Sequence, residues 1–125
     1  GIHLDGFDLD PEAAADPGTT LRVTLHWRTS QVIASNWTVF VHLVGADGSI
    51  LAQHDGPPSA GTAPTASWLP GETIADRHDL VIPASVAAHD GVLEVGLYDP
   101  VSGMRDGLEQ GGDSVRLGRV TIGHS

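Results

Sequence analysis

The residues of this chain that could do chemistry are its histidines and carboxylates. Seven His and sixteen Asp and Glu residues stand against six Arg and no Lys, so the net charge is −10 with His neutral. Four histidines fall in segments that we predict to be strands: His26, His42, His54 and His78. Two or three of these rings could meet on one sheet face and hold a transition metal with Asp55, Asp76 or Asp79, because imidazole and carboxylate ligate such ions.

A structural role for these histidines is the stronger interpretation. His42 stands between two apolar residues and is best explained as a core histidine, whereas His54 and His78 alternate outward with polar residues. We therefore predict no metal ligands and no cofactor. A structural calcium ion held by loop carboxylates stays an open alternative. Its candidate ligands are Asp5, Asp8 and Asp10, or Asp47 with Asp113.

The chain has none of the motifs that mark common catalytic sites, such as G-x-S-x-G, H-E-x-x-H or a glycine-rich phosphate loop. Asp76 could be paired with Glu72 or with Asp79 as in a glycosidase. A small β domain, however, offers no deep cleft to shift the pKa values of such a pair, and acid–base catalysis requires shifted values. We therefore predict no enzyme and no catalytic residue, with a hydrolase as the remote alternative.

The segment from Gln53 to Asp76, QHDGPPSAGTAPTASWLPGETIAD, is too long for a hairpin turn and is the most elaborate part of the chain. Its Trp68 could present its ring to a ligand, since sugars stack on exposed aromatic rings and hydrogen-bond to polar neighbours. The candidate ligand-binding residues are Trp68, Glu72, Gln53, Asp55 and Arg77, with Tyr98 and Asp99 on an adjoining edge. A structural alternative is favoured for two of them: Trp68 plugs the end of the fold, and Glu72 binds backbone N–H groups of the loop.

The elements that must position these residues are strands. Residues 20–28 alternate strictly, with Leu21, Val23, Leu25 and Trp27 on one face. Residues 37–44 are apolar on both faces, as in a covered central strand, and Asp47-Gly48 predicts a hairpin with two positive-φ positions into the next strand. Gly118 predicts a bulge that switches the inward face of the last strand. The predicted strands are residues 2–9, 20–28, 37–44, 49–54, 73–83, 91–99 and 114–123.

About seven short strands with Gly- and Pro-rich turns, and no helical segment longer than one turn, predict an all-β fold. We expect an antiparallel two-sheet β-sandwich, and periodicity leaves the immunoglobulin-like and jelly-roll topologies both open. A chain of 125 residues with 40% hydrophobic content allows one compact core, so residues 1–125 are predicted to form a single domain.

Three stretches resemble a β-sandwich module: WTVFVHLVGADGSILAQHDGPP, PTASWLPGETIAD and VGLYDPVSGMR. That module occurs in the extracytoplasmic C-terminal part of large bacterial membrane proteins, many described as family-39-type glycosyltransferases and others as uncharacterised membrane proteins. The resemblance covers about Leu9 to Ile122. It implies a domain excised from a membrane-anchored parent and lying on the extracytoplasmic face of a bacterial envelope. It carries over no catalytic or ligand-binding residue.

The charge narrows the choice of partners. A net charge of −10 repels phosphate backbones and anionic lipid, so we expect no nucleic-acid partner and no direct membrane contact by this domain.

The leading hypothesis is a non-catalytic accessory or interaction domain whose partner is a carbohydrate or an envelope protein. The alternative is a carbohydrate-binding module that uses the Gln53 to Asp76 segment. An exposed Trp68 would favour the alternative, and a buried ring would favour the leading hypothesis. The oligomeric state is left open.

Overall fold

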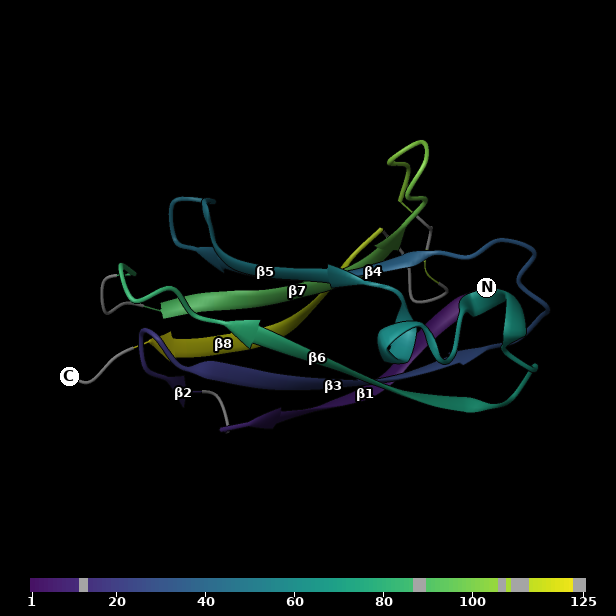
Figure 1. Ribbon diagram of the computed structural model, residues 1–125, viewed down its shortest axis with the longest axis horizontal. Helices are drawn as coiled ribbons and strands as arrows, with labels where there is room; N and C mark the ends of the chain where they lie inside the picture. Colours follow the sequence, from purple (N-terminus) through teal and green to yellow (C-terminus); the bar gives the residue numbers. More distant parts are fainter. Residues whose placement is uncertain (12–13, 87–89, 106–107, 109–112, 123–125) are drawn as a thin grey trace.

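The computed structural model describes residues 1–11, 14–86, 90–105, 108 and 113–122. Within these residues the protein is all-β, as predicted, with eight strands and two short 3-10 turns (Figure 1). The strands are β1 (Ile2–Asp10), β2 (Ala14–Ala15), β3 (Thr20–Thr29), β4 (Thr38–Gly45), β5 (Ile50–Gly56), β6 (Thr73–Val81), β7 (Asp90–Tyr98) and β8 (Val115–Ile122), and the turns are η1 (Pro58–Gly61) and η2 (Thr65–Ser67).

The strands form two sheets that lie on either side of one hydrophobic core. The three-stranded sheet has the order β1-β3-β6, and the five-stranded sheet, which is curled, has the order β2-β8-β7-β4-β5. All neighbouring strands pair antiparallel except β2 and β8, which are parallel. The edge strands β5 and β6 belong to different sheets but contact each other on one side of the molecule.

Each of the seven predicted segments contains a strand, and residue 123 of the last segment lies outside the described residues. The prediction of about seven strands missed β2, in which Ala14 and Ala15 pair with Thr121 and Ile122. Two residues are too few to show alternation, so nothing in the local sequence marks this strand.

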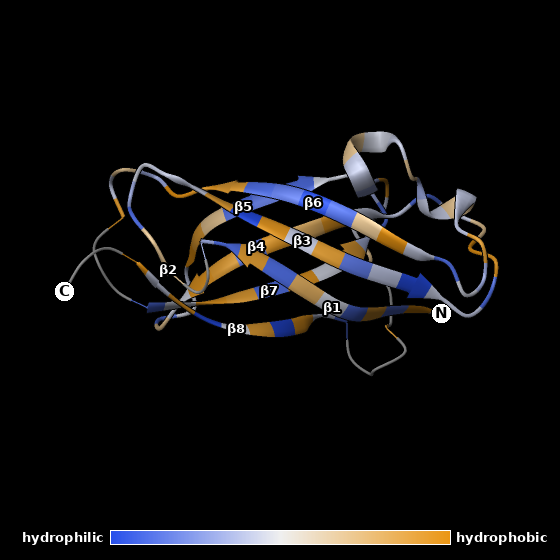
Figure 2. Cartoon of the chain, turned by 90° about the horizontal axis from the view of Figure 1, so that it is seen from below, coloured by the Kyte–Doolittle hydropathy of each residue, from blue (hydrophilic) through white to orange (hydrophobic). Residues whose placement is uncertain are grey.

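The core follows from the alternation of apolar residues, which Figure 2 shows as orange and blue bands along the strands. On β3, Leu21, Val23, Leu25 and Trp27 are completely buried, as predicted. β4 is covered on both faces: Val39, Val41 and Leu43 enter the core, whereas Phe40 is buried on the opposite face, under the guanidinium of Arg105 at 4.5 Å from its ring centroid.

Two turn predictions can be compared with the backbone. The β4–β5 hairpin exists, but only Gly48 has a positive φ, of 85°, so the expectation of two positive-φ positions was wrong. The N–H of Gly45 donates to the carbonyl of Ser49, which leaves a three-residue turn, and Gly48 supplies its left-handed position. The bulge at Gly118 is confirmed: the register shifts beside it, and the buried positions of β8 are then Val120 and Ile122.

The segment between β5 and β6 is folded against the rest of the protein. Trp68 is 2% exposed, and its Nε1 donates to the carbonyl of Ala63 at 2.8 Å. Thr65 is fully buried and joins this segment to the loop before β4, donating to the carbonyl of Ser35 and accepting from the N–H of Trp37 at 2.9 Å. These contacts hold η1 and η2 at one end of the two sheets (Figure 1).

Candidate functional site

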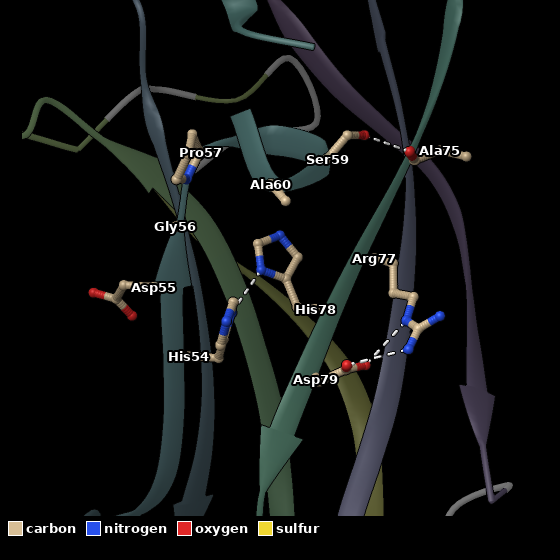
Figure 3. Close-up of a pocket in the computed structure, with 10 residues that line it drawn as sticks. All are labelled: His54, Asp55, Gly56, Pro57, Ser59, Ala60, Ala75, Arg77, His78 and Asp79. Carbon is tan, nitrogen blue, oxygen red and sulfur yellow. Dashed lines mark hydrogen bonds and ion pairs between the residues drawn. The ribbon is translucent and has the colours of Figure 1, made fainter. Parts of the chain in front are cut away.

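An open cavity of about 610 Å³ lies where the edges of the two sheets meet. β5 forms one wall, β6 forms the other, and η1 closes one end (Figure 3). Since β5 and β6 do not pair with each other, side chains rather than ladder hydrogen bonds line the gap. The lining residues are His54, Asp55, Gly56, Pro57, Ser59, Ala60, Ala75, Arg77, His78 and Asp79.

A buried carboxylate lies behind this cavity. Asp76 is fully buried and accepts three hydrogen bonds: from Trp27 Nε1 at 3.1 Å, from the backbone N–H of Ser59 at 2.7 Å, and from His78 Nε2 at 2.7 Å. Burying a carboxylate without partners is very costly, and here each partner supplies part of the lost hydration. Asp76 thus links the core indole, the η1 turn and the cavity histidine.

The two histidines of the cavity contact each other through their ring nitrogens. Nδ1 of His54, on β5, lies 2.9 Å from Nδ1 of His78, on β6, and the rings meet edge to face at 5.0 Å between centroids. His78 is 1% exposed, whereas His54 is half-buried and borders the open side. This hydrogen bond joins the two sheets directly (Figure 3).

The partners of Asp76 determine which nitrogens carry protons. The indole and the backbone N–H can only donate, and the carboxylate accepts both of their hydrogen bonds, so we assign the proton of the third hydrogen bond to Nε2 of His78. In the neutral ring, Nδ1 of His78 then accepts a hydrogen bond, and Nδ1 of His54 donates it. The resulting chain of hydrogen bonds runs from Asp76 through His78 to His54 at the cavity.

Backbone strain is concentrated in the η1 turn, beside the cavity. Ser59 and Ala60 have φ values of 52° and 54°, in the left-handed region where residues other than glycine are uncommon. Ser59 is tied to β6 by its N–H, which donates to Asp76, and by its hydroxyl, which donates to the carbonyl of Ala75 at 2.7 Å. Such strain persists only where surrounding contacts hold the backbone, and it is common at functional sites.

A bidentate ion pair forms the outer rim of the cavity. Nε and Nη2 of Arg77 lie 3.1 and 3.2 Å from the two carboxylate oxygens of Asp79. The hydrogen bond from Arg77 lowers the pKa of Asp79, and Asp79 in turn raises the pKa of Arg77. Both side chains are about half exposed, so this ion pair contributes little to the stability of the fold. Its guanidinium and carboxylate stay accessible to solvent as a hydrogen-bond donor and an acceptor.

The structure brings together only part of the predicted ligand-binding set. Asp55 and Arg77 line the cavity, although the carboxylate of Asp55 is directed away from the histidine pair and accepts a hydrogen bond from Tyr98 at 3.0 Å (Figure 3). Gln53 is exposed on β5, outside the lining, and lies opposite His42.

Trp68 and Glu72 have the structural roles that we favoured for them. The ring of Trp68 is buried, and Oε1 of Glu72 accepts a hydrogen bond from the N–H of Leu69 at 3.2 Å. Neither residue belongs to the cavity lining.

The histidine predictions fare differently. The expectation that His78 points outward was wrong, because it lies on the same face of β6 as Ile74 and Leu80 and is buried. His42 is largely buried, but on the outer face of its sheet beside Phe40, and His26 forms an exposed pair with Asp8 at 2.8 Å. Among the described residues, no three His, Asp or Glu side chains are arranged to hold a metal ion.

The carboxylate pairs considered for catalysis do not form. Asp76 and Asp79 lie on opposite faces of β6, one fully buried and the other exposed, and Glu72 is bound to loop backbone.

Asp76 was not identified from the sequence as a buried residue that holds Trp27, His78 and the η1 turn together through hydrogen bonds. Its signal was present in the alternation of β6, where Ile74, Asp76, His78 and Leu80 share one face. A polar pair in the phase of core residues indicates a buried hydrogen-bond network.

Comparisons with known proteins add no assignment. Neither a scan against protein-family models nor a search of curated proteins gives a match for this chain. In the described part of the chain, no helix is long and apolar enough to cross a membrane.

Proposed function

We propose that this chain is a non-catalytic interaction domain on the extracytoplasmic face of a bacterial envelope protein, and that it binds its partner at the cavity between β5 and β6. The observation that carries this proposal is the packing of residues 57–72. Buried Trp68 and Thr65 hold this segment in one conformation, and Asp76 fixes its η1 turn beside the cavity. A cavity that is already formed before binding saves the cost of ordering a loop.

The finer fold that we propose is an immunoglobulin-like β-sandwich. In the constant-type form of that topology the first, second, fourth and fifth strands form one sheet, and the third, sixth and seventh form the other. Here the fourth main strand, β5, belongs to the second sheet instead. β1, β3 and β6 lie together here, and β8, β7 and β4 form the centre of the second sheet, with β5 added at its edge. This strand order supports the immunoglobulin-like alternative over the jelly roll, which has eight strands and two Greek keys.

A binding role is favoured over catalysis because the strongest acid–base candidate is saturated. Both oxygens of Asp76 already accept hydrogen bonds inside the protein, and the side chain is fully buried. A carboxylate in this state orients His78 but has no access to a substrate.

The carbohydrate-binding alternative loses its main support. It required Trp68 to offer a ring for stacking, and that ring is 2% exposed. The Arg77 and Asp79 pair could still hydrogen-bond to sugar hydroxyls, so a glycan array separates the two hypotheses. We expect no glycan to bind. Glycan binding that Arg77→Ala abolishes and Trp68→Phe preserves would instead identify a carbohydrate-binding module.

Site-specific photo-crosslinking in the native host tests the interaction surface. A photoreactive residue at Arg77, on the rim of the cavity, is expected to crosslink a single partner. The control position is Arg116 on β8, which is 78% exposed and outside the cavity. Crosslinking of the same partner from both positions, or from neither, contradicts the proposed site.

Cysteine labelling tests the proposed location independently. The chain has no cysteine, so Ser102→Cys at an exposed turn creates a unique thiol. We expect a membrane-impermeant maleimide to label this thiol once the outer permeability barrier is opened and the inner membrane is intact. Labelling only after lysis of the inner membrane contradicts an extracytoplasmic location.

A further inference from the structure

We propose that His54 and His78 form a binding site for a divalent transition-metal ion, with Zn²⁺ as the representative ion, in which each ring ligates through Nδ1. This inference concerns the inner wall of the cavity and does not depend on the proposed partner.

The separation of the two nitrogens suits a shared metal ion. Two nitrogens that ligate Zn²⁺ at 2.0–2.1 Å in tetrahedral geometry lie roughly 3.3 Å apart. Nδ1 of His54 and Nδ1 of His78 are 2.9 Å apart. A shared tetrahedral ion lies roughly 35° off the line between the two nitrogens. Lengthening the separation by a few tenths of an ångström and rotating the rings until both lone pairs converge on the ion turns the hydrogen-bonded pair into a chelating pair.

The buried carboxylate supplies the support that metal-binding histidines usually have. A ligating histidine commonly donates its other ring N–H to a carboxylate, which fixes the ring orientation and makes the ligating nitrogen more basic. His78 makes this bond to Asp76 at 2.7 Å, and Asp76 is itself held by Trp27 and Ser59. Nδ1 of His78 is therefore an unprotonated electron-pair donor on the side of His54.

The surroundings admit an ion and leave coordination positions open. His54 borders the cavity, and the net charge of −10 attracts cations. Within the described residues, no third His, Asp or Glu joins the pair. The protein thus supplies two nitrogens, and water molecules complete the coordination. Imidazole nitrogen selects Zn²⁺, Cu²⁺ or Ni²⁺ over Ca²⁺ and Mg²⁺, which prefer oxygen.

The proton balance of binding is simple. In the neutral pair, Nδ1 of His54 carries the proton of the shared hydrogen bond. When the metal binds, that proton leaves Nδ1, and Nε2 of the same ring takes up a proton from solvent. No net proton is released from the neutral pair, and one is released when His54 begins as an imidazolium.

Calorimetric titration of the metal-free chain with Zn²⁺ tests the site. We expect one ion to bind per chain, with His54→Gln lowering the affinity more strongly than Asp76→Asn. Asp76→Asn should lower it about 10–100-fold, as for other carboxylates that orient a metal-bound histidine. Electron paramagnetic resonance of the Cu²⁺ complex should report two nitrogen ligands.

His26→Gln is the matched control, because it removes a histidine that also contacts a carboxylate, Asp8, but on the exposed face of β3, away from the cavity. Its affinity for Zn²⁺ should equal that of the unsubstituted chain. His54 is half-buried and its substitution is expected to fold, so the test does not depend on substituting buried His78. The proposal is overturned if His54→Gln binds Zn²⁺ as tightly as the unsubstituted chain, if His26→Gln weakens binding equally, or if Mg²⁺ competes at similar concentrations.

Discussion

The indole Nε1 of Trp27 donates a hydrogen bond to the carboxylate of Asp76 across 3.1 Å, and both side chains are completely buried. Trp27 belongs to β3 and Asp76 to β6, so the bond adds a side-chain link to the backbone ladder between these strands. Through Asp76 the same contact continues to His78 and to the η1 turn. The core and the cavity are therefore parts of one hydrogen-bond network.

Removing Asp76 should destabilise the protein strongly. Asp76→Ala leaves two buried donors, on Trp27 and His78, and the partly buried N–H of Ser59 without their acceptor. We expect a loss of about 3–5 kcal/mol in the free energy of unfolding. Urea denaturation followed by Trp fluorescence measures this loss. Asp79→Ala is the matched control, because this carboxylate is exposed and its ion pairs, with Arg77 and Arg22, lie on the surface. Its cost should stay below about 1 kcal/mol. Equal losses in the free energy of unfolding for the two variants would show that the hydrogen bonds of Asp76 do not stabilise the fold.

Trp68 should matter for stability through packing. Trp68→Ala removes a buried indole, and we expect a loss of about 3–5 kcal/mol from the cavity that it leaves. Its neighbour Leu69 is 65% exposed, and Leu69→Ala should change the stability by no more than about 0.5 kcal/mol. Thermal unfolding of the two variants checks the difference. A Trp68→Ala variant as stable as Leu69→Ala would mean that the ring does not hold the 57–72 segment in solution.

Relief of the left-handed strain in η1 should stabilise the fold. Ala60 has φ 54°, a conformation that costs a residue with a Cβ about 1–2 kcal/mol. Ala60→Gly removes this cost but adds roughly 0.5–1 kcal/mol of chain entropy in the unfolded state, so we expect a net gain of up to about 1.5 kcal/mol. Ala66→Gly, in the exposed η2 turn where φ is negative, is the control and should lose about 0.5–1 kcal/mol. If Ala60→Gly loses as much as Ala66→Gly, then Ala60 is not left-handed in solution.

Tyr98, which is the only tyrosine of the chain, should titrate above its usual range. Burial raises its pKa above the ordinary value of 10, and the hydrogen bond that it donates to Asp55 raises the pKa further. Because folding favours the neutral phenol, its contribution to stability is complete below about pH 10 and is lost as the pH rises through the folded pKa. Absorbance at alkaline pH measures the midpoint. Asp55→Asn should lower that midpoint, whereas Asp79→Asn, which removes a carboxylate that does not touch the phenol, should leave it in place.

The strands were predictable because burial on one face imposes alternation on the sequence, as in the run from Leu21 to Trp27. The structural roles of Trp68 and Glu72 could also be predicted, because both residues lie among the Pro and Gly residues of a long loop. In contrast, β2 depends on pairing with residues more than a hundred positions later, and no local pattern encodes that contact.

The cavity was only half predictable. The phase of β6 places Asp76 and His78 toward the core, and this could have been read from the sequence. Their meeting with His54 could not, because it depends on how the edges of two separate sheets approach each other. Periodicity within a strand assigns a side chain to a face and says nothing about which strand of the other sheet lies opposite.

The most direct test of the hydrogen-bond chain is long-range ¹H–¹⁵N NMR of the histidine rings at neutral pH in the metal-free protein. His78 should carry its proton on Nε2 with Nδ1 unprotonated, and His54 should carry its proton on Nδ1, with both rings held in a single tautomer. If His78 instead exchanges freely between tautomers, or carries its proton on Nδ1 alone, then Asp76 does not orient it and the chain from Asp76 to His54 does not exist.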